Sequence, residues 1–442
     1  MRGRILRVVS AFAAVAALGL LVNAGALRAD DDRNNDGDHG NKNGDKGNNN
    51  DDGGSRPGQT IPPQTLPQGF ESHSDLAHDA SQSRHAAQYS AWVVESSRFM
   101  RVPFRSFMPD RGDKPTVNLP VNLGIIKAAN GDITLYDSGW KQLSYIYDWQ
   151  FPSCCWHPIR EQMTKIGLDP NRVKRIIIGH GHWDHAGQLS EFPNATLYVQ
   201  KEELKQIDFF LAYPLQFNDG HIHAVNTVER HSYSNRQDLL NGGGTQQPPP
   251  NQGCARSPVC GYPPQTLQEI FGKVLHGKAQ IIDGRHVVDD GLIIHPAFRG
   301  HTYGSQLLQV NTSIGQVVFG SDTYSSWEGI RDWNVANIQQ TDTIQQMLAY
   351  EKCYALTSAT PLSADKRSGS YNQCIAAHEP NSYTPDYPIT ANWWNVPTGN
   401  CSRAAELVLS NGESTHVPAV PNRVYCENEV PPPQHPVPTY EK

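Results

Sequence analysis

The chain has 442 residues, a formal net charge of −7 and 8 cysteines. Residues 1–29 carry four arginines and no acidic residue, so their removal would take the charge to −11. An acidic chain of this kind is a poor candidate for binding nucleic acid or anionic lipid by bulk attraction, and we expect no nucleic-acid partner.

Residues 1–29 have the pattern of a secretory signal peptide. A basic start with three arginines is followed by an apolar run over residues 8–22 and by small residues at Ala26 and Ala29. The alternative is an uncleaved membrane anchor, but the run is shorter than the about 20 residues that a spanning helix needs. We therefore expect a periplasmic or secreted protein with no stable membrane insertion after cleavage.

The rest of the chain divides by composition. Residues 30–56 contain no hydrophobic residue and predict a disordered Asp/Asn/Gly-rich spacer. Residues 57–88 are rich in Pro and Ser and predict an irregular arm, and residues 89–385 predict the main domain. Inside that domain, residues 209–266 predict a long loop insertion, and residues 386–442 form a Pro-rich C-terminal extension.

All 8 cysteines lie beyond the signal segment. An even number of cysteines in an exported chain predicts disulfide bonds, because the compartment is oxidising. Spacing does not give their connectivity. Cys254–Cys260 and Cys401–Cys426 are two candidate pairs that would close short loops.

The main domain begins with an α/β pattern. The Asn-Gly-Asp turn inside residues 121–140 predicts a hairpin of two strands. Apolar residues at helical spacing predict a helix over 157–170, and the β-branched run at 173–178 predicts a buried strand. A helix is then expected at "HAGQLSEF", residues 185–192, and a strand at 195–200.

After the insertion the pattern returns to strands. We expect strands at "AQIID", "GLIIHPA", "SQLLQVNTS" and "GQVVFGSD", a helix at 338–356, and a last strand at 373–379. Beyond about residue 385 the chain has little periodicity, and no further element is predicted there.

A dense group of metal-ligand residues follows the strand at 173–178. His180, His182, Asp184 and His185 form the pattern H-x-H-x-D-H at a strand end, where sites in α/β sheets usually lie. Imidazole and carboxylate are ligands that zinc and its first-row neighbours accept. Four candidates in six residues exceed what one tetrahedral ion with an open position takes from a single loop, which favours two ions. The alternative is coincidence among the 18 histidines.

"HGHWDH" resembles the signature of the metallo-β-lactamase superfamily. "LYDSGW", "FRGHTYGSQ", "VVFGSDTY" and "CIAAHEP" resemble further landmarks of that family, in its order along the chain. The resemblance covers roughly residues 89–385. It implies a four-layer αββα sandwich, an α/β fold, with the metals at one edge between the two sheets.

The resemblance also implies a ligand set for two zinc ions, although other first-row divalent metals fit the same ligands. One ion would be held by His180, His182 and His301, and the second by Asp184, His185 and His378, with Asp322 bridging. Asp137 would lie near the site in a supporting role. At His378 the flanking Ala-Ala and Glu depart from the Pro-Gly and Asp that the family often has. We interpret His221 and His223 as loop residues of the insertion.

The activity that the resemblance implies is hydrolysis by metal-activated hydroxide, with Asp184 or Asp322 handling the proton. An acidic residue at Asp322 argues against a dedicated β-lactamase, and "FPNATLYVQKEEL" resembles the N-acyl homoserine lactonases. We therefore expect a small-molecule ester substrate, a lactone. Tyr324 is a candidate to contact the substrate, one position closer to Asp322 than in those lactonases; the alternative is an ordinary strand-end tyrosine.

Several alternatives stay open. The same site would also suit a periplasmic organophosphate or β-lactam hydrolase, and a non-catalytic exported binding protein is a hypothesis of another class. Trp183 either lines the pocket or packs beneath the metal loop. The insertion at 209–266 is either a lid over the site or a packing or homodimer element.

Overall fold

The computed structural model describes the following residues: 71–82, 86–103, 116–141, 153–154, 156–212, 261–262, 264–324, 326–336, 342–357, 373–379, 392–395 and 403–413. All of them belong to one compact unit, Pro67–Lys442. The predictions of a signal peptide and a spacer fall outside the described residues, as does the insertion from 213 to 260. Within the described part, no helix has the length and apolar character that crossing a membrane requires.

The larger of two sheets has nine strands among the described residues, and eight of them form a continuous path in the order β13-β14-β1-β2-β3-β5-β6-β7. Strands β3, β5, β6 and β7 pair in parallel, the other neighbours pair antiparallel, and β4 pairs with β1 off this path. The strands are β1 (Ser90–Pro103), β2 (Thr116–Lys127), β3 (Ile133–Tyr136), β4 (Ser153–Cys154), β5 (Val173–Ile177), β6 (Thr196–Gln200), β7 (Ala279–Ile282), β13 (Asn392–Asn395) and β14 (Arg403–Val408).

The smaller sheet has five strands in the described part of the chain, in the order β12-β11-β10-β9-β8. Only the pair β11–β12 is parallel. The strands are β8 (His286–Asp289), β9 (Leu292–Pro296), β10 (Gln306–Thr312), β11 (Gly315–Ser321) and β12 (Cys374–Ala376).

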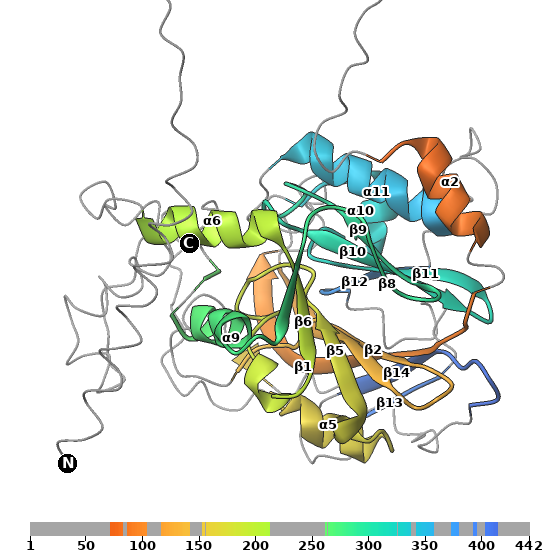
Figure 1. The fold of residues 1–442 in the computed structure, drawn as a ribbon, viewed down its shortest axis with the longest axis horizontal. Coiled ribbons are helices and arrows are strands. Elements are labelled where there is room, and N and C mark those ends of the chain that lie inside the picture. The colour runs from red at the N-terminus through yellow and green to blue at the C-terminus, as the bar shows by residue number, and fades with distance from the viewer. Residues whose placement is uncertain are drawn as a thin grey trace, which may run out of the picture. The chain divides into compact units, whose positions relative to one another are not determined.

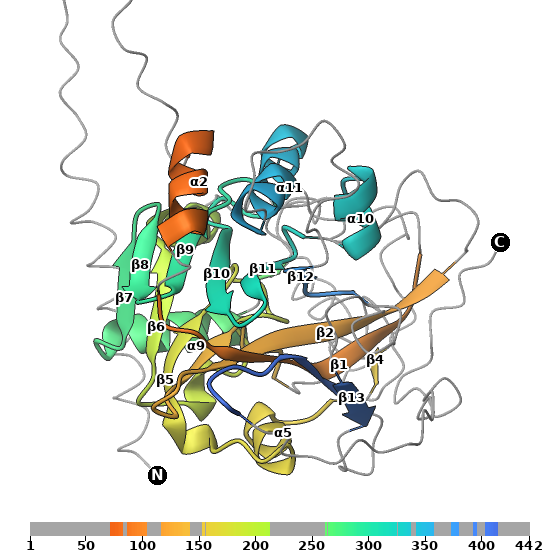
Figure 2. The ribbon, with the colours of Figure 1, turned by 90° about the vertical axis from the view of Figure 1, so that its right-hand side faces the viewer.

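Helices cover the outer faces of both sheets (Figures 1 and 2). Helices α2 (His73–Gln82), α10 (Trp327–Asp332) and α11 (Thr343–Thr357) lie over the smaller sheet, and α5 (Ile159–Lys165) and α9 (Pro264–Leu275) lie over the larger one. Helix α6 (Lys201–Ala212) continues directly from β6. This arrangement is the four-layer αββα sandwich, so the predicted fold class is confirmed.

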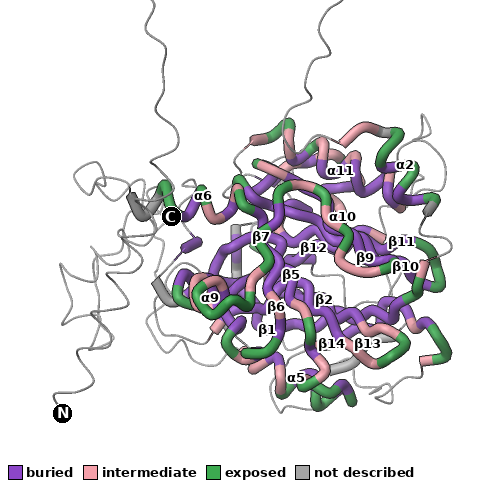
Figure 3. The backbone as a smooth tube through the Cα atoms, viewed as in Figure 1, coloured by how far each residue is buried: buried purple, intermediate pink, exposed green. Residues whose placement is uncertain are grey.

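Three apolar cores lie between the four layers. Successive side chains of a strand point to opposite faces, so each sheet contributes side chains to two of these cores. On β5, Ile176 belongs to the core beneath α5 and α9, whereas Ile177 belongs to the core between the sheets. On β10, Leu308 faces the core between the sheets and Leu307 faces the core beneath α11. Figure 3 shows the resulting buried interior, with exposed residues concentrated on helices and turns.

Most predicted elements are confirmed. The hairpin is β2–β3, where Gly131 takes the left-handed φ of 84° that the turn requires. The helix expected at 157–170 is α5, and the strand expected at 173–178 is β5. The strands expected after the insertion are β7, β9, β10, β11 and β12, and the helix expected at 338–356 is α11; strand β8 was not predicted.

The prediction of a helix at 185–192 is wrong except for a single 3₁₀ turn, Leu189–Glu191. The residues before this turn form hydrogen-bonded turns within the loop that follows residue 180. His182 O accepts hydrogen bonds from the backbone N–H groups of His185 and Ala186, and Gly187 N donates to Gly139 O.

Two regions for which no helix or strand was predicted contain one. The arm predicted as irregular at 57–88 includes α2, whose Leu76 packs into the core beneath α11. In the C-terminal extension, β14 pairs with β1, and its Ala405 and Leu407 enter the core between the sheets. Both elements depend on contacts with distant parts of the chain, so their own sequences carry a weak signal.

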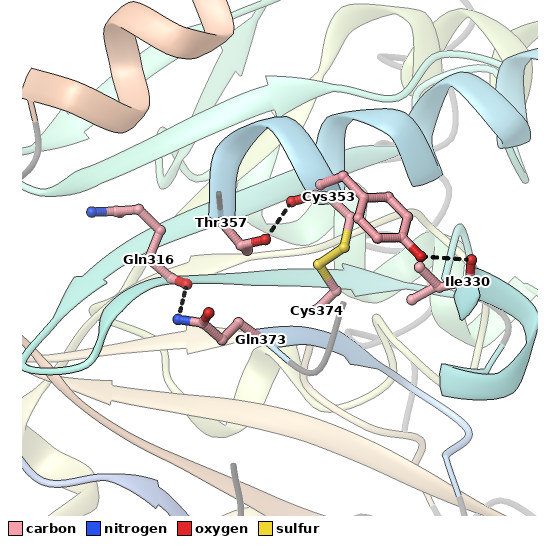
Figure 4. The surroundings of a disulfide bond; sticks show 7 residues. Gln316, Ile330, Cys353, Thr357, Gln373 and Cys374 are labelled. Atoms are coloured by element: carbon pink, nitrogen blue, oxygen red, sulfur yellow. Dashed lines mark hydrogen bonds between the residues drawn. A yellow bond between two sulfur atoms is a disulfide. The ribbon is translucent and has the colours of Figure 1, made fainter. Parts of the chain in front are cut away.

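A disulfide bond joins Cys353 of α11 to Cys374 of β12, which confirms the prediction of disulfide bonding (Figure 4). Beside it, Gln373 Nε2 donates a hydrogen bond to Gln316 O at 2.9 Å. The disulfide bond therefore fixes the strand that leads to His378. Both candidate pairs named from the sequence lie outside the described residues.

Candidate metal centre

The predicted ligands lie on turns that follow strands of both sheets. The loop after β5 carries the H-x-H-x-D-H motif, and the β9–β10 connection carries His301. Asp322 directly follows β11, and His378 lies two residues after β12. The loops meet closely: Gln306 N donates to Gly179 O at 2.9 Å, and a Cβ at Gly179 would stand 2.3 Å from the Cβ of Ser321. Only glycine fits at that contact.

The structure brings all seven predicted ligands together in two groups whose candidate ligand atoms lie within 4.8 Å of one another. The first group is His180, His182, His301 and Asp322, and the second is Asp184, His185, His378 and Asp322.

Asp322 belongs to both groups because its two oxygens face different histidines. Oδ2 lies 3.3 Å from His301 Nε2, and Oδ1 lies 3.1 Å from His185 Nε2 and 3.0 Å from His378 Nε2. This division is the geometry that a bridging carboxylate needs.

The residues fit a pair of divalent metal ions. The Nε2 atoms of His180 and His182 are buried and have no hydrogen-bond partner among the described residues. Buried polar atoms are nearly always paired, so these two converging nitrogens indicate a further partner. Five imidazoles and two carboxylates form a donor set that zinc and neighbouring first-row ions accept.

The first group holds its imidazoles in the neutral form that binds metals. Burial lowers the pKa of His180 and of His182 well below the ordinary value, and the neighbouring histidines lower it further. Burial also lowers the pKa of His301, to about 4. Their nitrogen lone pairs are therefore available at neutral pH.

The second group is dominated by its carboxylates. Burial alone would lower the pKa of His378, but Asp322 and Asp184 raise it to about 10. The same two carboxylates, with Asp137, raise the pKa of His185 above its usual range against the effect of burial. Two buried carboxylates at this place require positive charge, which a divalent cation supplies as an imidazolium does.

Further contacts orient the imidazoles through their Nδ1 atoms. Asp137 Oδ2 lies 2.9 Å from His185 Nδ1, and Asp137 Oδ1 accepts from Gly179 N at 2.6 Å. His378 Nδ1 is 2.7 Å from Pro120 O, to which it donates. These partners turn the Nε2 atoms toward the site, as the outer contacts of metal-binding histidines do.

Trp183 packs with Phe99 and Trp140, with ring centroids 5.5 and 5.0 Å away. The Phe99 ring lies 5.6 Å from the ring of His378. We call Phe99, Trp140 and Trp183 the aromatic cluster; it forms an apolar flank beside the second group.

Tyr324 lies away from the role predicted for it. Its side chain is fully buried in the core beneath α11, with its ring centroid 6.3 Å from that of Tyr350. The backbone turns immediately after β11, where Ser321 has a left-handed φ of 49°, and this turn sends Tyr324 into the core. We therefore do not retain Tyr324 as a substrate contact and adopt the alternative of a packed tyrosine.

Two residues that the sequence did not identify also contact the ligand loops. Glu203, in the first turn of α6, accepts a hydrogen bond from Gly181 N at 2.6 Å, and Tyr262 lies with its ring 4.9 Å from that of His182. An acid among apolar residues in the helical pattern "KEELKQI" was the one available signal for Glu203, and nothing in the sequence marked Tyr262.

The chain matches one protein family over part of its length and individual curated proteins over short segments. Residues 117–347 match the Metallo-beta-lactamase superfamily. A segment of 42 residues is 45% identical to N-acyl homoserine lactonase AttM of Azorhizobium caulinodans, and one of 43 residues is 44% identical to AttM of Agrobacterium fabrum. Each segment is 10% of this chain and spans 16% of the relative.

The chain is also similar to solved structures of hydrolases, at low sequence identity. A quorum-quenching N-acyl homoserine lactone lactonase has 15% identity and a TM-score of 0.42, over 67% of this chain and 95% of that one. The hydrolase AbOPH of the beta lactamase superfamily has 14% identity and a TM-score of 0.40, over 73% of this chain and 96% of that one. The match to the superfamily covers more than half of the chain and confirms the predicted resemblance. The chain therefore belongs to the metallo-β-lactamase superfamily.

Proposed function

We propose that the protein is an exported hydrolase with two metal ions, most simply zinc, that opens the ester bond of a lactone of the N-acyl homoserine type. The observation that carries this proposal is the division of the Asp322 carboxylate between two groups of ligands. A binding protein without catalysis has no need for two complete sets of ligands around one shared acid.

Two divalent ions bound at such a site would lower the pKa of a coordinated water molecule far below that of bulk water, to about 7, and would polarise an ester carbonyl. The residues of the first group that would hold one ion are His180, His182 and His301, and those of the second are Asp184, His185 and His378, with Asp322 shared.

The chain itself contributes orientation and acid–base groups. Asp137 fixes the ring of His185, and Pro120 O fixes that of His378, so that both Nε2 atoms face Asp322. Asp184 Oδ2, which lies 3.4 Å from His378 Nε2, is one carboxylate oxygen placed to take a proton as the ester opens, and Asp322 is the other candidate.

The lactone as substrate rests on two supports. The curated relatives that match short segments of this chain are N-acyl homoserine lactonases. The second support is the apolar character of the buried aromatic cluster, whose Phe99 ring lies 5.6 Å from that of His378; an apolar flank of this kind suits the acyl chain of such a lactone.

Export rests on the N-terminal pattern of residues 1–29 and is supported by the disulfide Cys353–Cys374, since disulfides persist in oxidising compartments. Cell fractionation followed by N-terminal sequencing of the purified protein tests it. We expect a periplasmic or secreted chain that begins after Ala26 or Ala29; a cytoplasmic chain that keeps Met1 would contradict export.

The substrate is tested with the purified mature protein and four probes: an N-acyl homoserine lactone, an aryl ester, a β-lactam and a phosphotriester. We expect the lactone to be hydrolysed with the highest kcat/KM, activity to disappear on treatment with a chelator, and zinc to restore it. Metal-dependent turnover of the phosphotriester or β-lactam alone would refute the lactone while retaining the metal site. No metal-dependent turnover of any probe would refute the proposed activity.

A further inference from the structure

Glu203 is a buried acid that touches both loops of the first ligand group. It lies in the first turn of α6, and its side chain has no exposed surface. A buried carboxylate is costly unless hydrogen bonds satisfy it. Four do so here: Gly181 N at 2.6 Å, Tyr262 Oη at 2.5 Å, Thr302 Oγ1 at 2.7 Å and Gly304 N at 3.0 Å.

The two carboxylate oxygens serve different segments. Oε1 accepts from Gly181, which stands between His180 and His182, and from Tyr262. Oε2 accepts from Thr302, the residue after His301, and from Gly304. One carboxylate therefore ties together the loops that carry all three histidines of the first group.

The fit around Glu203 is close. A Cβ at Gly304 would stand 2.2 Å from Glu203 N, and a Cβ at Gly181 would stand 3.0 Å from Glu203 Oε1. Both loops therefore approach α6 at positions that have no side chain. Tyr262 completes the contact, because its ring packs edge-on against His182 while its hydroxyl donates to Glu203.

We propose that Glu203 is a positioning residue, assisted by Tyr262, that sets the geometry of the first metal site by holding the 180–182 and 301–304 segments at a fixed separation. The inference rests on the proposed function, since it takes His180, His182 and His301 to be ligands. It differs from a general packing role because the two oxygens must both be acceptors, whereas packing requires only the shape of the side chain.

Glu203→Gln separates these two roles. Glutamine keeps the shape but has one acceptor oxygen, so its NH₂ group would face donors of either the Gly181–Tyr262 pair or the Thr302–Gly304 pair. Glu202→Gln is the matched control on the same helix, where the side chain is paired with Lys205 at 2.6 Å near the surface. Tyr262→Phe removes one donor and keeps the ring against His182.

The experiment uses the full mature chain and measures zinc affinity by chelator competition, the visible spectrum of the Co²⁺-loaded protein, and the unfolding midpoint. For Glu203→Gln we expect the affinity of one of two zinc ions to fall about 10- to 100-fold, the range for changes in the outer contacts of metal ligands, together with an altered Co²⁺ spectrum. We expect a smaller fall in the same site for Tyr262→Phe and no change for Glu202→Gln.

Unchanged zinc affinities and Co²⁺ spectrum in Glu203→Gln, with only a lower unfolding midpoint, would overturn the inference and leave the proposed function standing. If Glu203→Gln does not fold, Tyr262→Phe decides by the same two readouts. A wild-type chain that binds no zinc would instead overturn the proposed function, and the inference with it.

Discussion

Two clusters of acids and histidines border the smaller sheet, and they are satisfied in different ways. One is the pair of ligand groups around Asp322. The other, which we call the helix-side cluster, is Glu71, Asp79 and His295, whose candidate ligand atoms also lie within 4.8 Å of one another. By residue type alone both would pass for metal sites.

In the helix-side cluster the protein supplies the cations itself. Lys352 Nζ lies 2.7 Å from Glu71 Oε2, and the Arg285 guanidinium makes two 2.6 Å hydrogen bonds to Asp79. His295 bonds to Glu71 through Nδ1 and to Gln309 through Nε2, both at 2.8 Å.

Around Asp322 the described residues place no Lys or Arg against the two carboxylates, and the Nε2 atoms of His180 and His182 have no hydrogen-bond partner in the described part of the chain. The partners of a His/Asp/Glu cluster, more than its composition, therefore distinguish a metal site from a structural ion-pair network.

The largest effect is expected from the shared ligand. Asp322→Ala removes a carboxylate from both groups, so kcat/KM for the lactone should fall by more than about 100-fold, beyond the range for changes in outer contacts. Steady-state kinetics measure it, with the exposed Asp208→Ala as control. A fall of less than tenfold would show that Asp322 does not bridge the site.

The disulfide links the two clusters, because Cys353 follows Lys352 on α11 and Cys374 begins the strand that leads to His378. The paired change Cys353→Ala and Cys374→Ala opens a link with a sequence separation of 21, and the free energy of unfolding should fall by about 3 kcal/mol. Urea unfolding measures this loss. Equal midpoints for the wild type and the double variant would contradict it.

Glu71→Gln tests the helix-side cluster. It leaves the Lys352 ammonium buried with a neutral partner, so we expect a loss of about 3 kcal/mol in the free energy of unfolding, at the low end for breaking buried ion pairs. Zinc content and kcat/KM should not change. The control is Glu161→Gln, at an exposed position. Loss of zinc from Glu71→Gln but not from this control would show that the helix-side cluster binds metal, which would contradict the prediction.

The same carboxylate predicts a pH dependence. Burial would raise the pKa of Glu71, but His295 and Lys352 lower it from 4.5 to about 2. Because the folded state binds this proton less readily than the unfolded state, the stabilisation is fully present above pH 4.5 and is lost as the pH falls toward about 2. The stability difference between wild type and Glu71→Gln should therefore shrink over that interval, measured by urea unfolding; a difference that grows would reverse the assigned sign.

The smallest effect is expected at Tyr324. Its hydroxyl is buried without a hydrogen-bond partner among the described residues, so Tyr324→Phe should change the free energy of unfolding by less than about 1 kcal/mol and leave kcat/KM unchanged. Lactone kinetics decide this. A tenfold loss of kcat/KM would restore the substrate contact that was first predicted for it.

Four of the ligands could be predicted from local pattern, because the H-x-H-x-D-H spacing directly follows an apolar strand. His301, Asp322 and His378 were predicted from the resemblance of their surrounding segments to the superfamily, and each stands just after a strand or in the turn between two strands. The four layers were likewise implied by that resemblance, and the apolar run at 173–178 agrees with them, since Ile176 and Ile177 enter different cores.

What could not be predicted depends on distant partners. Glu203 becomes informative only when Gly181 and Thr302 lie against it, and Glu71 only when Lys352 does. Strand β14 forms by pairing with β1, more than 300 residues earlier in the chain, and its short alanine-rich sequence has little strand signal of its own.

The most direct test of the comparison is the metal content of the purified mature chain, measured by inductively coupled plasma mass spectrometry beside that of Asp322→Ala and Glu71→Gln. We expect two metal ions per chain in the wild type and in Glu71→Gln, and fewer in Asp322→Ala. Less than one ion per wild-type chain, or metal lost from Glu71→Gln and retained by Asp322→Ala, would contradict it.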